Sequence, residues 1–244
     1  MARFVLEIMY DGTNYAGWQK QPNTKTVQSE IEHALEVILR EPISIMGSGR
    51  TDAGVHAQQQ FAHFDTNVTI PDDHRFFRSL KGLLPRDILV KKIRKVDDEF
   101  HVRFDAKCRQ YRYQFSNHHD VFNDKYTWVI QKNLNVTAMK ECAQLLYGTH
   151  DFASFSKFSA EVANTRCEIL ASEIVMVDEG RWHYRIRANR FLHHMVRSLV
   201  GGMVHVGTGK ITLQEFERRL NEPDNANFSF LAPANALFLE EVVY

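Results

Sequence analysis

The stretch GSGRTDAGVHA, residues 47–57, places three glycines, one arginine and one aspartate between two apolar segments. Glycine permits positive φ angles and a close approach of the backbone, which a tight excursion between two strands requires. We therefore expect residues 47–57 to form a loop that carries Arg50 and Asp52 outward from the end of a sheet. A second interpretation stays open, in which Asp52 only caps an ordinary glycine-rich turn by accepting hydrogen bonds from its own backbone.

A phosphate-binding P-loop is the first alternative for a glycine-rich stretch. Residues 47–57 lack the GK[ST] ending of that motif, and the strand-like segment FAHF, residues 61–64, follows where a helix would begin. The sequence therefore excludes a P-loop at this position.

Outward from the loop, the spacing of apolar residues predicts alternating strands and helices. In the first half we expect strands at 3–10, 43–47, 56–66 and 88–96, and helices at 27–39 and 72–84, the first of them capped by Thr26. In the second half we expect strands at 108–116, 167–177, 181–188 and 236–244, and helices at 137–148, 191–206 and 213–220. This order predicts an α+β fold of two similar subdomains, residues 1–105 and 106–244. Each would be an antiparallel sheet with helices packed on one face, and an active-site cleft would lie between them.

The composition indicates a soluble protein of a reducing compartment. Among 244 residues there are only three cysteines, Cys108, Cys142 and Cys167, without the CxxC spacing of a zinc or redox site. The sequence has no signal peptide pattern and no run of about 18 apolar residues that would cross a membrane. We therefore expect a cytoplasmic protein without a membrane partner.

Basic residues gather in two runs, although the formal net charge is zero. Residues 75–95 contain eight basic residues and one acid, and residues 181–197 contain five arginines and no acid. Such runs either solvate a face of the protein or bind the phosphates of a nucleic acid. The candidates for contacts with an RNA backbone are Arg75, Arg78, Lys81, Lys91, Lys92 and Arg94.

Adjacent histidines occur at 118–119 and 193–194, but they do not indicate a metal site. Neighbouring residues on a strand or helix point in different directions, whereas structural zinc sites use spaced Cys or His ligands. His56 and His63 are expected to make structural hydrogen bonds. No dinucleotide fingerprint is present either, so we expect neither a metal nor a cofactor.

Residues 47–57 closely resemble the signature of the TruA family of tRNA pseudouridine synthases. Further matches are YDGTNYAGWQKQ near the start, CRQYRYQF in the middle, GTHDFASF at 148–155, FLHHMVRSLVGGMVHVGTGK at 191–210 and the ending APANALFLEEVVY, so the resemblance covers nearly the whole chain. Two departures are the segment AQQQFAHF, which is more polar than expected, and His193. The resemblance implies the pseudouridine synthase fold, a homodimer, and the tRNA anticodon stem-loop as substrate at positions 38–40.

The resemblance also implies roles for individual residues. Asp52 would be the catalytic carboxylate, and Arg197 would supply the cation that keeps it ionised. Tyr111 would stack on the target uracil, Leu192 would line the base pocket, and Arg50 would contact phosphate or occupy the space of the extruded base. Plainer interpretations are a snorkelling helix arginine for Arg197 and core packing for Tyr111. We expect core packing for Tyr113.

Pseudouridine formation breaks the bond between uracil N1 and ribose C1′ and rejoins the base through C5, which needs no cofactor. One carboxylate can attack C6 or C1′ covalently, or remove the C2′ proton to give a glycal, and the residues do not choose among these routes. The uridine must be flipped out of its stack, which costs a few kcal/mol, while stacking on an aromatic ring contributes about 1 to 3 kcal/mol.

Two further functions remain alternatives on the residues. A noncatalytic tRNA-binding module would keep the basic runs and use Asp52 as a turn cap. A hydrolase with an aspartate nucleophile is less well supported, because no second carboxylate or general base lies at a recognisable spacing nearby.

Overall fold

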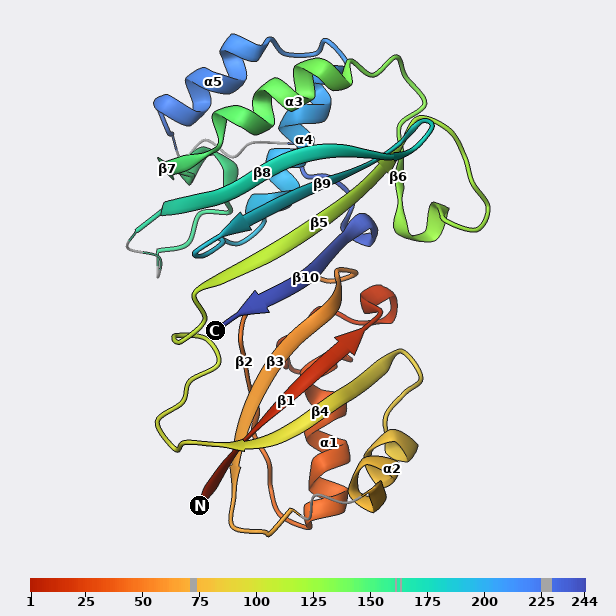
Figure 1. Cartoon of the computed structure of the whole chain (residues 1–244), viewed down its shortest axis with the longest axis vertical. Helices are drawn as coiled ribbons and strands as arrows, with labels where there is room; N and C mark the ends of the chain where they lie inside the picture. Colours follow the sequence, from red (N-terminus) through yellow and green to blue (C-terminus); the bar gives the residue numbers. More distant parts are fainter. Residues whose placement is uncertain (71–73, 161, 163, 225–229) are drawn as a thin grey trace. The chain divides into compact units, whose positions relative to one another are not determined.

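The computed structural model describes residues 1–70, 74–160, 162, 164–224 and 230–244 (Figure 1). The chain divides into two compact units. The first comprises Met1–Lys107 together with Phe238–Tyr244, and the second comprises Cys108–Leu237. The C-terminal segment thus belongs to the first unit, whereas we expected it in the second subdomain, residues 106–244. We describe each unit by itself.

The sheet of the first unit has the strand order β4 (Ile88–Val96), β1 (Ala2–Tyr10), β3 (His56–Thr66), β10 (Leu237–Val243). β1 runs antiparallel to both β3 and β4, and the short β2 (Met46–Gly47) pairs antiparallel with β3. β10 runs parallel to β3, where an antiparallel sheet was expected. Because β10 comes from the far end of the chain, no short turn dictates its direction.

The helices of the first unit are α1 (Val27–Leu39) and α2 (His74–Leu83). The predicted cap of α1 is confirmed: Thr26 accepts a hydrogen bond from the Ser29 backbone, and the Ser29 side chain accepts one from the Thr26 backbone. Figure 1 shows α1 crossing behind β1 and β4, and the alternating residues Leu6 and Ile8 of β1 are fully buried. The residues Asp72 and Asp73, predicted to begin α2, lie outside the described residues.

The sheet of the second unit has the order β5 (Cys108–Ser116), β9 (Arg181–Ala188), β8 (Arg166–Asp178), β7 (Gly148–Asp151), with all pairs antiparallel. The short β6 (Trp128–Val129) lies parallel to β5. Its helices are α3 (Val136–Leu145), α4 (Met195–Gly207) and α5 (Leu213–Asn221), and Figure 1 shows α4 behind β8 and β9. The core contains the fully buried side chains of Tyr113, Tyr184, Phe155 and Phe216.

Three predicted elements differ from the observed ones. β2 spans only two residues of the expected 43–47, because the backbone amides of Ile43 and Ile45 donate to the Glu36 and Glu32 carboxylates. The helix expected from residue 191 begins at Met195, since His194 has a φ of 66° and breaks the helical backbone before it. β7 begins at Gly148, within the segment expected to end a helix, because α3 ends at Leu145.

The helices that the structure describes are all too short or too polar to cross a membrane.

Candidate active site

The loop of residues 48–55 connects β2 to β3, as the glycine pattern predicted. The two strands pair in antiparallel register, with Met46 opposite His63 and Gly47 opposite Ala62. A strand, not a helix, follows the loop, so the exclusion of a P-loop is confirmed. Within the loop Gly54 has a φ of 77°, and the Val55 amide donates to the Asp52 carbonyl oxygen at 3.2 Å. The chain thus turns back toward the sheet immediately after Asp52.

Backbone hydrogen bonds hold this loop at both ends. The Trp18 amide donates to the Thr51 carbonyl at 3.1 Å, and the Gly54 amide donates to the Tyr15 carbonyl at 3.4 Å. At the other end, the Ser48 amide donates to the Phe61 carbonyl at 2.7 Å. Asp52 is therefore carried by a backbone that two separate segments fix on either side.

The segment that follows β1, residues 11–18, lies directly against this loop. Gly17 has a φ of 101°, and a Cβ placed there would be only 2.6 Å from the Thr51 carbonyl oxygen. An L-residue at position 17 would therefore have to displace the backbone beside Asp52. This supporting role of the segment YDGTNYAGW was not predicted from the sequence, although Gly17 was the available signal.

Buried side chains add to the support of the loop. The hydroxyls of Tyr10 and Thr51 are 2.8 Å apart, and both residues are buried. His56, also buried, accepts a hydrogen bond from the Gly12 amide at its Nδ1 atom, at 3.0 Å. His63 accepts one from the Val102 amide at 3.4 Å. The prediction of structural hydrogen bonds for His56 and His63 is confirmed.

Asp52 and Arg50 differ in how far they reach solvent. Asp52 is half-buried and Arg50 is exposed, while Thr51 between them is buried. The loop therefore presents two charged side chains outward from an anchored backbone. The Val55 amide, which closes the turn, donates to the Asp52 backbone carbonyl.

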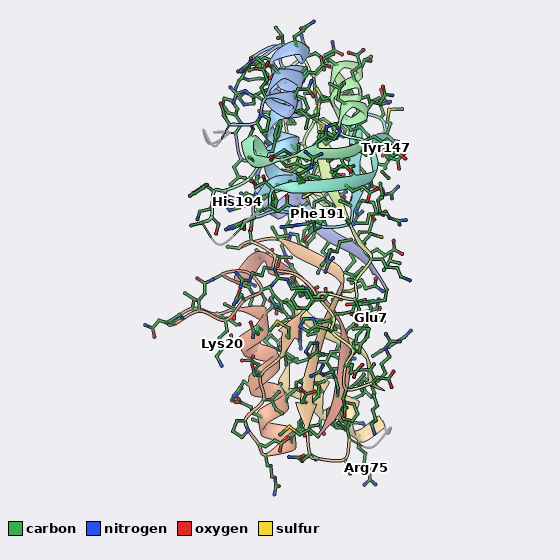
Figure 2. All side chains as sticks on the ribbon, turned by 90° about the vertical axis from the view of Figure 1, so that its left-hand side faces the viewer. Glu7, Lys20, Arg75, Tyr147, Phe191 and His194 are labelled. Carbon is green, nitrogen blue, oxygen red and sulfur yellow. The ribbon has the colours of Figure 1, made fainter. Side chains whose placement is uncertain are left out.

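The second unit gathers the other predicted site residues near the start of α4. Tyr111 on β5 lies opposite Ile186 of β9 and makes an edge-to-face contact with Phe191, with the ring centroids 5.0 Å apart. Its side chain is 9% exposed, so it borders the core. Leu192 is half-buried in the turn before α4, and its carbonyl accepts from the Met195 amide at 3.2 Å. Phe191 and His194, from the same turn, are labelled in Figure 2.

Tyr113 and Arg197 lie together in this unit. Tyr113 is completely buried and donates its hydroxyl hydrogen to the Pro233 carbonyl at 2.9 Å, so the prediction of core packing is confirmed. Burial raises the pKa of Tyr113 well above its ordinary value, and the nearby charge of Arg197 opposes that rise. Arg197 donates from Nε to the Ala232 carbonyl at 2.8 Å, and the Ala232 amide donates back to the Arg197 carbonyl at 3.2 Å. Its guanidinium is therefore oriented by the protein and does not simply snorkel to solvent.

The predicted RNA-backbone residues all lie on α2 and β4 of the first unit. Their side chains are exposed, and Figure 2 shows Arg75 pointing away from the ribbon. Lys91 pairs with Glu7 at 3.0 Å, which lowers the pKa of the Glu7 carboxyl against the opposing effect of its burial. A small cavity of about 160 Å³ is lined by Lys92 and Arg94 together with Val5, Glu7 and Phe61. β4 therefore presents cations beside a hollow in the sheet surface.

The histidines at 118 and 119 bond to different partners. His118 lies 3.2 Å from the Asn117 side-chain oxygen, and His119 lies 2.8 Å from the Asp124 carboxylate. These contacts use the two rings to order the loop after β5. At 193–194, by contrast, the ring centroids of His193 and His194 lie 4.1 Å apart, so the expectation that adjacent histidines point in different directions is wrong for this pair.

Comparisons with known proteins support one family. A family profile described as tRNA pseudouridine synthase matches residues 7–105 and 142–244, which include Asp52, Leu192 and Arg197 but not Tyr111. A protein named "tRNA pseudouridine synthase A" from Porphyromonas gingivalis is 40% identical over 246 residues, covering 100% of this chain and 98% of its own length. One of the same name from Chlorobaculum tepidum is 42% identical and covers 98% of this chain and 96% of its own length. Among solved structures, a Cbf5-Nop10-Gar1 complex aligns with 83% of this chain and 54% of that chain at 12% identity and a TM-score of 0.33, too low to bear on the fold.

Proposed function

The chain belongs to the tRNA pseudouridine synthase family, and from this premise we propose that Asp52 is the carboxylate with which it isomerises uridine to pseudouridine in tRNA. The observation that carries the proposal is the anchored loop. Thr51 and Gly54 are both hydrogen-bonded to the segment of residues 15–18, and Asp52 lies between them with a half-exposed side chain. A carboxylate that must meet one atom of a large substrate needs such a preorganised backbone.

The reaction moves one bond and exchanges one proton. The N1–C1′ bond breaks, the uracil turns, C5 bonds to C1′, C5 loses its hydrogen, and N1 gains one, so no electrons enter or leave. Asp52 can begin this change by attacking C6 or C1′, or by removing the C2′ proton. Each route requires the ionised carboxylate. We propose Arg197 as the cation that favours it, since Ala232 holds its guanidinium in a fixed orientation.

The uridine has to leave its stack before a carboxylate can reach it. We propose that Tyr111 stacks on the flipped uracil, with Leu192 lining the same pocket. The edge contact of Tyr111 with Phe191 supports this assignment, because it holds the tyrosine ring in one orientation. Arg50, exposed beside the anchored Thr51, would contact a phosphate or occupy the place of the extruded base.

The rest of the substrate would be held through its phosphates. We propose that the exposed cations of α2 and β4, which are Arg75, Arg78, Lys81, Lys91, Lys92 and Arg94, contact the RNA backbone. Lys91 would contribute least, because Glu7 already neutralises it. By resemblance we also propose the anticodon stem-loop as the target region, at positions 38–40, a homodimer as the active form, and a cytoplasmic location.

The test is release of tritium from tRNA labelled at uridine C5, measured with no added metal or nucleotide. We expect release by the wild type and none by Asp52→Asn, with equal tRNA affinity of the two proteins in filter binding. Equal release by both proteins would remove Asp52 from the chemistry. Binding without release by the wild type would favour a noncatalytic tRNA-binding module.

A further inference from the structure

Gln60 is a fully buried amide in the strand that follows the Asp52 loop. It belongs to the segment AQQQFAHF of β3, which is unusually polar for a strand in a core, and its side chain is 0% exposed. Burying an amide without hydrogen-bond partners costs free energy, whereas burying an apolar side chain of the same size stabilises the fold. The hydrogen-bond partners of Gln60 therefore decide whether its burial is favourable.

Both ends of the Gln60 amide bind the loop. Its Oε1 accepts a hydrogen bond from the Ser48 hydroxyl, and its Nε2 donates to the Gly49 carbonyl at 2.9 Å. The Ser48 amide also donates to the Phe61 carbonyl, the next residue on the strand. Ser48 is itself 1% exposed. Residues 48 and 49 are thus clamped to residues 60 and 61 through one buried side chain and one backbone bond.

Packing does not restrain Gly49 in the same way. A Cβ built on Gly49 would meet no described residue within 4 Å, apart from the two chain neighbours, so the backbone has open space on that side. Glycine also has the widest range of backbone conformations. The hydrogen bond from Gln60 to the Gly49 carbonyl therefore restrains the backbone immediately before Arg50.

The two neighbouring glutamines have other uses. Gln58 is exposed, and Gln59 donates to Glu7 at 3.3 Å and accepts from the Val242 amide at 3.1 Å. Of these three residues, Gln60 is the one whose amide bonds to residues 48 and 49. Gly49 is held on one side of Arg50, and Thr51 is held on the other by Tyr10 and the Trp18 amide.

We propose that Gln60 is a positioning residue for the reaction, which aims Asp52 by clamping Ser48 and Gly49. This inference rests on the proposed role of Asp52. Gln60 does not contact the substrate, so its loss slows the chemical step and leaves tRNA affinity unchanged. A misplaced catalytic group can lower a rate by about 100-fold.

The test is the single-turnover rate constant of tritium release at saturating tRNA for Gln60→Leu, with Gln58→Leu as the matched control on the exposed face. We expect a rate constant about 10- to 100-fold below wild type for Gln60→Leu, a Kd for tRNA within about twofold, and wild-type values for Gln58→Leu. A purely structural role would instead lower the amplitude, which counts folded active sites, and would leave the rate constant of the folded fraction unchanged.

Two further variants keep the test decisive. Gln60→Met has a similar length but cannot donate to the Gly49 carbonyl, so it serves if Gln60→Leu does not fold, and we expect the same slow rate from it. Adding Ser48→Ala to Gln60→Leu should slow the reaction little further, because the clamp is already lost. A wild-type rate constant in both folded Gln60 variants, or a loss that lies in Kd, would overturn the proposal. No release by the wild type would instead overturn the proposed function.

Discussion

The hydroxyl of Tyr10 lies 2.8 Å from Oγ1 of Thr51, and this buried pair joins the end of β1 to the residue immediately before Asp52. Forty-one positions separate Tyr10 from Thr51 in the chain. Together with the backbone hydrogen bond from the Trp18 amide to the Thr51 carbonyl, this pair fixes the position of Thr51 in the loop. The geometry of a single charged side chain thus depends on the packing of the first strand.

Tyr10→Phe tests the contribution of this pair. Removing the hydroxyl leaves the buried Thr51 oxygen without that partner, so the free energy of unfolding should fall by about 1 kcal/mol in urea titrations. The single-turnover rate of pseudouridine formation should fall by up to about tenfold, equivalent to 1.4 kcal/mol of the activation barrier. Tyr147→Phe, at a 68% exposed site, should change neither value. Equal rates for the two variants would show that the loop keeps its geometry without Tyr10.

Gly17→Ala should loosen or displace the loop. The left-handed backbone at residue 17 and the overlap of a Cβ with the Thr51 carbonyl should lower the free energy of unfolding by at least about 1 kcal/mol. Gly82→Ala is the matched control, because Gly82 lies in α2 and a Cβ there meets open space. Gly82→Ala should raise the free energy of unfolding by up to about 1 kcal/mol, because alanine favours the helix over glycine. Thermal or urea unfolding of both variants would reveal the opposite signs, and a neutral Gly17→Ala would contradict the close approach.

His63 should make stability fall in weak acid. Burial, followed by the charge of Arg3, lowers the pKa of His63 to about 4 from its ordinary 6.5. Between these values the unfolded chain binds a proton that the folded protein does not. The free energy of unfolding should therefore decrease as the pH falls from 6.5 to 4, by at most about 1.4 kcal/mol for each pH unit.

His63→Gln removes this titration and retains an acceptor for the Val102 amide. The difference in unfolding free energy between wild type and variant, measured by urea titration from pH 4 to 7, isolates the contribution of His63. His33→Gln, at an exposed site, is the matched control for a histidine substitution. Parallel curves for wild type and His63→Gln would mean that His63 binds protons equally in the folded and unfolded states, and would contradict the lowered pKa.

The exposed cations of β4 should control how salt affects tRNA binding. Each of Lys92→Ala and Arg94→Ala should reduce the slope of log K against log salt by about 0.7 to 0.9, the value of one lost phosphate contact. Arg218→Ala is the control, since Arg218 already pairs with Glu215 on α5 at 3.0 Å. Filter binding at several salt concentrations measures the slopes. Unchanged slopes for both β4 variants would show that Lys92 and Arg94 do not contact tRNA phosphates and only solvate the surface of the protein.

Local features were predicted well because they depend on neighbouring residues. The Thr26 cap and the alternation of Leu6 and Ile8 follow from spacing within one element. The predicted start of α4 at residue 191 was wrong. The segment FLHH has the apolar spacing of a helix, but the backbone of His194 has a positive φ, which spacing cannot reveal. The parallel direction of β10 depended on a pairing over a long stretch of chain, which no local pattern encodes.

By itself the sequence determined the existence of the Asp52 loop, the strand after it, and the resemblance that the family comparison bears out. Only the tertiary structure decided what holds that loop, namely Tyr10 and Trp18 from a distant segment and Gln60 from the strand that follows the loop. The physical reason is that hydrogen-bond partners are chosen by the register of the sheet, which brings together groups that no spacing along the chain relates. The polarity of AQQQFAHF was visible in the sequence, but its use became clear only when Gln60 was seen buried against Gly49.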